Sequence, residues 1–529
     1  MMDVSYEKKL EELGAFEISS SMLKLAKNNE RHNSFLNAGR GNPNWINTQS
    51  RLALARLLEW GCQESRLTMD KGNMAGYTQK SGIAKRLHAY LQTHDDETSQ
   101  FLNKALAYCT NTLGLDEDDL VKELCDATVG NNYPVPSRCL VNIEKILNAY
   151  LQSTLYAGVD LKDTTKVFPT EGGTAAMCYI FSSLEHNGLL CPGDKIAINT
   201  PIFTPYLQIP ELTAYSMCEV DLASKEENNW HIDLDELEKL KDPSIKAFFL
   251  VNPSNPGSHA LDKAALEKIA EICKQRDDLM IITDDVYGTF VNGFQTVYAV
   301  APYNTLLVYS FSKLYGVTGW RCGLIAMNEN NVFDALIKKL DQSKLDELHH
   351  DYSIVTLEPD TFPFVERICA DSRSIGLYHT SGLSTPQQAM MACMALTHLV
   401  CEGEDPYIKQ SMGIVSQRYE SLFDGLGVET DDDPTNAKYY SLIDVYKIAQ
   451  RLYDEDFASW LRSNFEQVDF LVRLAEEDGV VLMEGVGFDA TPGTLRVSQA
   501  NLPDEAYSKI AQRVLDILAE YHSMYTASK

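Results

Sequence analysis

Three features are missing from this sequence, and each absence excludes a class of protein. No apolar run is long enough to span a bilayer, and the chain does not open with a charged segment followed by an apolar one. The twelve cysteines form no Cys-x-x-Cys pair and have no histidine cluster near them, which argues against a zinc site or a disulfide framework. We therefore expect a cytoplasmic protein with reduced, mostly buried thiols and no bound metal.

Basic residues are also scarce. The chain has 46 lysines and arginines against 75 aspartates and glutamates, a formal net charge of −29. Nucleic acids and anionic membranes are polyanions that such a chain would repel, so we expect neither as a partner. With 529 residues and 44% hydrophobic content, the chain can bury one large core and a smaller one.

Short apolar segments alternate with helical ones from about residue 140 onwards. This spacing is typical of βαβ units and predicts an α/β fold with a mainly parallel, buried sheet. After about residue 400 the pattern becomes α+β, with amphipathic helices expected over 457–474 and two short strands over 480–483 and 495–497. The candidate strands of the large sheet are 195–198, 247–251, 280–283, 305–309 and 324–326.

The first 130 residues have mainly helical patterns. A helix is expected around residues 22–25, whereas 35–45 is too rich in turn residues for regular helix or strand. Amphipathic stretches separated by acidic turns follow, from about residue 50 to 130. We expect four units: an N-terminal segment with part of the small domain (1–75), a helical insert (76–132), a large domain (133–400) and a C-terminal small domain (401–529).

The most informative stretch is SFSKLYGVTGWRCG, which begins at Ser310. The strand before it would place Lys313 at the edge of the sheet where ligands of α/β folds bind, and an amine there can form an imine. Ser312 and Arg321 could bind a phosphate together with Ser310, among glycines that let the backbone approach the ligand. A lysine after a strand is more often a solvated surface residue, so further signals are needed.

Such signals follow the neighbouring strands. Asp284 directly follows the strand expected over 280–283 and suits a protonated ring nitrogen, because a buried carboxylate without a cation is costly. Asn255 lies in a rigid turn, and it and Tyr287 could donate to a phenolate oxygen. Phe203 could cover an aromatic ring, and the segment 170–176 precedes a helix whose free amides would bind phosphate.

Each of these residues has a plainer structural alternative: Asp284 could cap a helix, Asn255 could serve only the turn, and Phe203 could be a core aromatic. Their order after successive strands favours the functional interpretation. Together they supply what pyridoxal 5′-phosphate requires: an imine lysine, a carboxylate for the ring nitrogen, donors for the ring oxygen, a stacking ring and a phosphate cup.

The motifs Ser310-x-Ser312-Lys313 with Arg321, Asn255-Pro256-Gly257 and Asp284-x-x-Tyr287 resemble those of the fold-type I, aspartate-aminotransferase-like pyridoxal-phosphate enzymes, over roughly residues 130–500. The segment 37–45, the helical insert and the length resemble the aspartate 4-decarboxylase branch. The resemblance implies a large domain with a mainly parallel seven-stranded sheet flanked by helices, and a smaller α+β domain.

The resemblance also implies roles for individual residues. Arg496 would bind the substrate α-carboxylate, a task that suits the two parallel hydrogen bonds of a guanidinium. A tyrosine of a neighbouring subunit would contact the phosphate, and Tyr133 is favoured over Tyr77 by its distance from Thr170. The remaining assignments are the Schiff-base lysine (Lys313), the partner of the ring nitrogen (Asp284), the ring-oxygen donors (Asn255, Tyr287), the stacking ring (Phe203) and the phosphate cup (Gly173, Thr174, Ser310, Ser312, Arg321).

The sequence departs from the family at two places. Asn255-Pro256-Gly257-Ser258 replaces Asn-Pro-Thr-Gly, and Tyr378 and His379 stand where aspartate aminotransferases keep an arginine for the distal carboxylate, Arg373 being too early. A weaker hold on that carboxylate suits its loss. We therefore expect β-decarboxylation of L-aspartate to L-alanine and carbon dioxide through a ketimine, with a minor aminotransferase activity. Arg40, beside Gly41, is our candidate for orienting the β-carboxylate.

Two other functions compete with this one. A class I amino-acid aminotransferase would share every cofactor residue, whereas a regulator built on the same fold would need a basic DNA-binding domain, which the acidic N-terminal region does not offer. The family resemblance further implies pyruvate as a 2-oxo acid that restores the cofactor. It also implies a homodimer at least, and a larger homo-oligomer such as a dodecamer.

Overall fold

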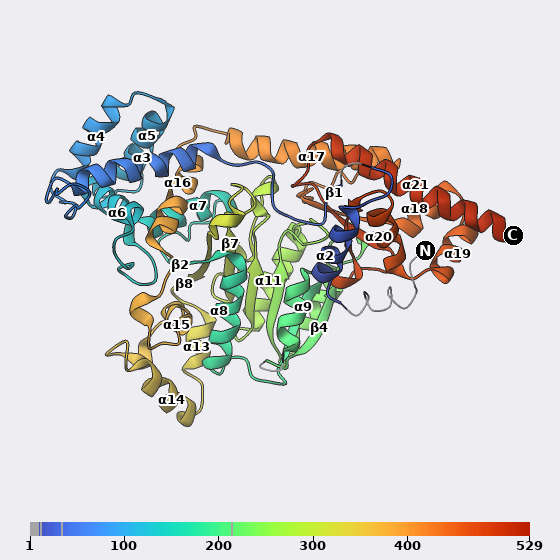
Figure 1. Cartoon of the computed structure of the whole chain (residues 1–529). Helices are drawn as coiled ribbons and strands as arrows, with labels where there is room; N and C mark the ends of the chain where they lie inside the picture. Colours follow the sequence, from blue (N-terminus) through green and yellow to red (C-terminus); the bar gives the residue numbers. More distant parts are fainter. Residues whose placement is uncertain (1–9, 11–12, 33–34, 213–214) are drawn as a thin grey trace.

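A seven-stranded sheet forms the centre of the computed structural model, which describes residues 10, 13–32, 35–212 and 215–529 (Figure 1). The strand order is β2-β8-β7-β6-β5-β3-β4; β3 to β7 are parallel, and β8 runs antiparallel to both of its neighbours. The predicted mainly parallel sheet is therefore confirmed. Its strands are β2 (Thr165–Thr170), β3 (Lys195–Thr200), β4 (Cys218–Ala223), β5 (Ile245–Val251), β6 (Met280–Asp284), β7 (Thr305–Ser310) and β8 (Gly323–Asn328).

The edge strands β2 and β4 were not predicted. β2 contains Pro169, which is tolerated at an edge, where only one side of the strand forms a ladder. β4 carries Glu219 and Asp221, and its burial is only partial, so it has no continuous apolar run. The five predicted strands are the five interior strands, which are buried along almost their whole length.

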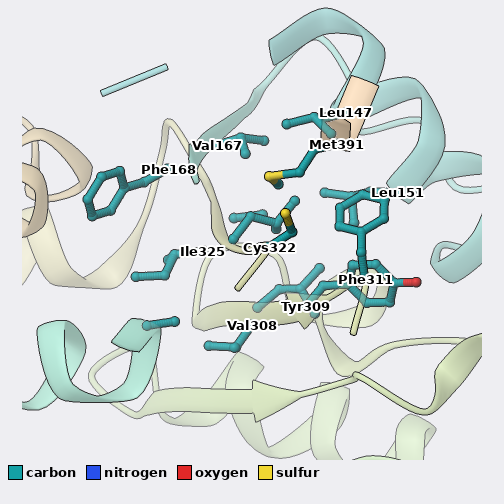
Figure 2. Packing of buried hydrophobic residues seen from close by; sticks show 14 of the residues in the cluster. Leu147, Leu151, Val167, Phe168, Val308, Tyr309, Phe311, Cys322, Ile325 and Met391 are labelled. Carbon is teal, nitrogen blue, oxygen red and sulfur yellow. The ribbon is translucent and has the colours of Figure 1, made fainter. Parts of the chain in front are cut away.

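Both faces of the sheet are covered, which explains the apolar character of its central strands. In β5, Phe248 and Leu250 join the apolar cluster with α11 (Lys263–Gln275), while Phe249 and Val251 face the larger cluster on the other side. Figure 2 shows the larger cluster where β7 and β8 meet Leu147 of α7 (Val141–Leu155) and Met391 of α16 (Thr385–Leu399). The other helices of the large domain are α8 (Gly172–His186), α9 (Thr204–Glu211), α10 (Leu234–Glu238), α12 (Val297–Val300), α13 (Val332–Ile337), α14 (Gln342–Tyr352) and α15 (Phe364–Asp371).

The predicted helical region lies at one end of the molecule (Figure 1). It contains α3 (Thr48–Ser65), α4 (Ile83–Thr93), α5 (Glu97–Asn111) and α6 (Glu117–Val129). Two of the acidic turns cap helices: Asp96 accepts a hydrogen bond from Ser99 N, and Asp116 from Asp119 N. α3 packs on α5, α6 and α16, so residues 48–65 lie with the insert and the large core.

The C-terminal part is α+β, and α2 (Ala15–Ala26) and β1 (Leu36–Asn37) lie beside it (Figure 1). β9 (Tyr440–Asp444), β11 (Met483–Glu484) and β12 (Thr494–Ser498) form an antiparallel sheet, and β1 pairs with β10 (Val480–Val481) in parallel. The helices are α17 (Pro406–Leu426), α18 (Val445–Leu452), α19 (Glu455–Asn464), α20 (Gln467–Glu476) and α21 (Glu505–Ser528). In the described ranges, no helix is long and apolar enough to cross a membrane.

The helices expected over 457–474 are present as α19 and α20, which are separated by the extended backbones of Phe465 and Glu466. Two other local predictions were wrong in part. The strand expected over 480–483 is two strands, β10 and β11, which belong to different sheets. The segment 35–45 is mostly irregular as expected, but Leu36 and Asn37 form β1.

Candidate active site

A cavity of about 200 Å³ lies beyond the ends of β5, β6 and β7. Its lining brings together residues that are up to 480 positions apart in the sequence, from Phe16 to Arg496. The predicted site residues that line it are Gly41, Gly173, Thr174, Phe203, Asn255, Asp284, Tyr287, Ser310, Ser312, Lys313, Arg321 and Arg496.

Lys313 lies three residues after the end of β7, and its half-buried side chain lines the cavity. Its Nζ donates a hydrogen bond of 3.2 Å to the carbonyl oxygen of Gly41, which also accepts one of 2.8 Å from the hydroxyl of Tyr439. In the part of the chain that the structure describes, the lysine amine therefore hydrogen-bonds to a backbone oxygen and to no carboxylate. This leaves the amine available for chemistry in the cavity.

One side of the cavity is rich in donors that suit a phosphate. Gly173 and Thr174 lie in the first turn of α8, where backbone amides lack helical partners. Ser310 Oγ and Ser312 Oγ lie 2.8 Å apart, and the Arg321 guanidinium donates a 3.2 Å hydrogen bond to the Glu171 carbonyl from the solvent side. Arg321 has a φ of 56°, a strained conformation of the kind found at functional sites.

Two of the glycines in this region permit close contact between chain segments. A Cβ on Gly323 would lie 2.6 Å from the backbone carbonyl carbon of Gly172, and one on Gly316 would lie 1.9 Å from the Trp45 carbonyl oxygen. We expected these glycines to admit a phosphate. The structure shows instead that they admit neighbouring backbone, and this contact places the start of α8 beside β8.

Asp284 lies in the wall of the cavity at the end of β6 and is 8% exposed. Burial raises the pKa of its carboxyl, although the hydroxyl of Tyr206 donates to Oδ2 at 2.7 Å and the amide of Val286 to Oδ1 at 3.2 Å. A cation beside this carboxylate would offset the cost of its burial. A protonated ring nitrogen is such a cation.

Arg496 in β12 is 2% exposed and is held from two sides. Its Nη1 donates to Asn255 Oδ1 at 3.0 Å, and its Nη2 to the carbonyl oxygen of Gly39 at 2.6 Å. Its Nε has no hydrogen-bond partner in the described part of the chain. A buried guanidinium with an unsatisfied N–H in a cavity wall is suited to bind a carboxylate.

Two predicted residues lie outside the cavity lining. Arg40 is exposed, although its neighbour Gly41 lines the cavity. Tyr133 is 67% exposed, and its ring lies 6.4 Å from that of His379; the alternative Tyr77 is also 67% exposed. The roles expected for these residues stay predictions. Arg373 does not reach the cavity either, because it forms an ion pair with Glu171.

The sequence did not reveal six residues of the lining. Tyr206 follows Phe203 by one helical turn, and this spacing was the available signal. Tyr440 comes from the distant strand β9 and left no local signal. The full set is Phe16, Tyr206, Val251, Val286, Thr318 and Tyr440.

The residues present fit pyridoxal 5′-phosphate. Burial raises the pKa of the Asp284 carboxyl, and the nearby Lys313 charge offsets this only in part; the first turn of α8 with the two serines and Arg321 offers several donors for one phosphate. Phe203 is half-buried in the wall, with its ring edge-on to Phe16 at 5.7 Å. Lys313 supplies the amine that the cofactor aldehyde requires.

Comparison with known proteins agrees with this site. The family model of class I and II aminotransferases matches residues 136–514. A Pseudomonas sp. protein described as a bifunctional aspartate aminotransferase and L-aspartate beta-decarboxylase is 41% identical over 523 residues, 98% of each chain. An aspartate aminotransferase from Pyrococcus abyssi is 32% identical over 26% of this chain and 36% of its own.

Solved structures show the same fold. A Thermus thermophilus aspartate aminotransferase double mutant has a TM-score of 0.59 at 16% identity, over 94% of this chain and 95% of its own. The aspartate aminotransferase from Rhizobium meliloti also has a TM-score of 0.59, at 15% identity, over 96% of each chain. The predicted fold-type I architecture is thus confirmed, and the chain belongs to the family of class I and II aminotransferases.

Proposed function

We propose that this chain is a pyridoxal-phosphate enzyme that removes the β-carboxylate of L-aspartate, giving L-alanine and carbon dioxide, with aspartate transamination as a minor activity. One observation carries the proposal: the complete cavity around Lys313, Asp284 and Arg496 occurs in a chain that matches a bifunctional decarboxylase along 98% of its length.

When bound, pyridoxal phosphate supplies an electron sink for the pair of electrons left by the departing carboxylate. Asp284 would hold the proton on the ring nitrogen, which keeps that sink strong. Lys313 has the one lysine amine in the described lining, so it is the group that takes the proton from the substrate Cα and later returns it.

Arg496 would bind the substrate α-carboxylate and fix the direction of the side chain. Because Asn255 and the Gly39 carbonyl already hold its two terminal nitrogens, the guanidinium loses little freedom when the substrate binds. The substrate is thereby aligned with Lys313 by a rigid group.

The β-carboxylate would be held less tightly. In the described lining, the only guanidinium groups are those of Arg496 and Arg321, and Arg321 lies on the phosphate side. A bidentate grip would stabilise the carboxylate that must leave and so would slow its loss. We propose that Arg40 orients this group from the cavity rim, where its neighbour Gly41 lies.

We further propose a homodimer at least, and a dodecamer as the larger assembly, with Tyr133 reaching the phosphate of a neighbouring subunit. Tyr133 and Val135 support this proposal, because they are 67% and 81% exposed and contribute nothing to the cavity of their own chain. Pyruvate is the proposed 2-oxo acid that restores the cofactor after transamination. The cytoplasm is the proposed location, since all twelve cysteines are free thiols.

The test is to supply aspartate in large excess over pyruvate and to measure carbon dioxide and alanine. Decarboxylation predicts equal amounts of both, far beyond the pyruvate added. Alanine capped by the pyruvate, with oxaloacetate accumulating, would establish an ordinary aminotransferase instead. A Lys313→Ala variant is the control, and it should form no carbon dioxide, alanine or oxaloacetate above background.

A further inference from the structure

Tyr440 is a cavity residue to which neither the sequence nor the family resemblance assigned a role. It opens β9, is 2% exposed and contacts two of the groups described above. Its hydroxyl lies 3.0 Å from that of Tyr287, and its ring faces the guanidinium of Arg496, whose Cζ is 4.4 Å from the ring centroid. One side chain thus links the ring-oxygen donor to the carboxylate-binding arginine.

Gly41 makes room for this hydroxyl. A Cβ at position 41 would lie 1.9 Å from Tyr440 Oη, less than any non-bonded contact allows. Any other residue at position 41 would therefore displace the hydroxyl from Tyr287. The absence of a side chain at Gly41 is needed for the Tyr440 position, independently of any contact that Gly41 makes with substrate.

The turn that carries Asn255 also anchors Tyr440. The amide of Tyr440 donates to Ser258 Oγ at 2.8 Å, and the amide of Ala437 donates to the Ser258 carbonyl at 2.8 Å. Next to it, His259 Nε2 pairs with Asp431 Oδ2 at 2.5 Å. Ser258 belongs to the turn where this chain departs from the family motif, so that departure fixes the segment leading into β9.

The hydrogen count of the two phenols determines their arrangement. Each phenol has one hydroxyl hydrogen, and only one of these two hydrogens can lie between the two oxygens, which are 3.0 Å apart. Tyr440 Oη has no other hydrogen-bond partner in the described part of the chain, whereas Tyr287 lines the cavity where the cofactor oxygen would be. If Tyr287 donated to Tyr440, it would have no hydrogen left for that oxygen.

We propose that Tyr440 donates its hydrogen to Tyr287 and thereby directs the hydrogen of Tyr287 to the ring oxygen of the bound cofactor, while its ring packs on Arg496. Tyr440 is therefore a positioning residue that couples the cofactor site to the α-carboxylate site. Burial raises the pKa of Tyr287, so that phenol keeps the proton it must donate. The inference rests on cofactor binding in the proposed function and not on which reaction follows.

The test is the pH titration of the visible absorption band of the bound cofactor, without substrate. A donor on the ring oxygen stabilises the deprotonated chromophore and lowers the pH at which the band changes. Tyr440→Phe should raise the apparent pKa of the band by about half to one unit, the size expected for one weakened hydrogen bond. Tyr287→Phe should raise it further, and adding Tyr440→Phe to that variant should cause no additional shift.

The matched control is Tyr150→Phe, which removes the buried 2.8 Å hydrogen bond between Tyr150 and Tyr309, away from the cavity lining. It should leave the titration unchanged. If Tyr440→Phe does not fold, Gly41→Ala displaces the same hydroxyl and should shift the titration in the same direction. The proposal would be overturned if a folded Tyr440→Phe variant had the same apparent pKa of the cofactor band as the wild type. It would also be overturned if Tyr440→Phe still shifted that pKa in the Tyr287→Phe background. Loss of decarboxylation alone would bear on the proposed function only.

Discussion

Arg373 Nη2 lies 2.9 Å from Glu171 Oε1, at the residue that precedes the first turn of α8. The same carboxylate accepts a 3.0 Å hydrogen bond from Tyr179, and the Glu171 carbonyl accepts one from Arg321. Arg373 thus compensates a negative charge next to the proposed phosphate cup. This explains why Arg373 does not serve as an arginine for the distal carboxylate.

Removing Arg373 should therefore weaken cofactor binding. Arg373→Ala leaves the charge of Glu171 uncompensated beside the phosphate, and because the ion pair is partly exposed, we expect a dissociation constant about two- to fivefold higher. Titration of cofactor into the apoenzyme measures it. Arg56→Ala, which breaks the distant pair with Asp96, should have no effect. If Glu171→Gln fails to restore binding in the Arg373→Ala background, charge compensation is not the reason.

Tyr206 should matter through Asp284. Tyr206→Phe removes the 2.7 Å hydrogen bond to Oδ2, so the buried carboxylate, whose pKa burial already raises, becomes harder to ionise and pairs less well with the ring nitrogen. The expected result is a loss of kcat of about tenfold, measured by alanine formation at saturating cofactor. A variant as active as the wild type would show that Asp284 does not need this donor.

Arg40→Ala tests the proposed contact with the β-carboxylate. If Arg40 orients this group, the variant should lose decarboxylation relative to transamination and raise the KM for aspartate by about tenfold, as expected for one lost charged hydrogen bond. Arg40→Lys should retain part of the effect. An unchanged ratio of carbon dioxide to transamination product in Arg40→Ala would refute the role.

Asp285 gives a pH dependence of stability. It is 0% exposed, and burial raises its pKa from 3.8 to about 8. Between these pH values the folded chain keeps a proton on Asp285 that the unfolded chain releases. The contribution of this carboxyl to the free energy of unfolding is therefore complete below about pH 4 and is lost as the pH rises towards 8. Asp285→Asn should flatten this decline between pH 5 and about 8 in thermal unfolding, whereas Asp163→Asn, at an 89% exposed side chain, should not. Parallel curves for Asp285→Asn and the wild type would contradict the assignment.

Subunit mixing tests the role of Tyr133. Lys313→Ala would inactivate the site of its own subunit, whereas Tyr133→Ala would inactivate the site of the neighbouring subunit. A hybrid dimer of the two variants would therefore contain one site with both changes and one site with neither. Random mixing should then recover about a quarter of wild-type activity, because half of the dimers are hybrids with one intact site. Recovery with Tyr77→Ala instead of Tyr133→Ala would transfer the role to Tyr77, and no recovery with either would exclude a shared site.

Much of the site could be predicted because its residues lie at strand ends or within a few residues of them. A buried strand gives a local apolar signal, and the residues at and just after its end reach the sheet edge; this holds for Lys313, Asp284 and Asn255. Tyr440 could not be found this way, since its contact with Tyr287 joins positions 153 residues apart. Such contacts depend on how the C-terminal part packs on the sheet.

Element boundaries were beyond prediction for a similar reason. The apolar pattern continues across Phe465 and Glu466, and neither a glycine nor a proline marks where α19 ends and α20 begins. Likewise, Gly323 could be recognised as a site of close approach, but its partner, the backbone of Gly172, lies on a separate strand–helix unit. Sequence periodicity shows which face of a helix or strand is buried, but it does not show which other segment packs against that face.

The most direct test of the central claim uses aspartate labelled with carbon-13 at one carboxylate. With the label at the β-carboxylate, we predict that most of it leaves as carbon dioxide, in equal amount to the alanine formed, and that only the minor transamination leaves label in oxaloacetate. With the label at the α-carboxylate, which Arg496 is proposed to bind, we predict that none of it appears as carbon dioxide. Release of the α-label would contradict the assigned substrate orientation, and oxaloacetate as the main carrier of the β-label would contradict decarboxylation as the main activity.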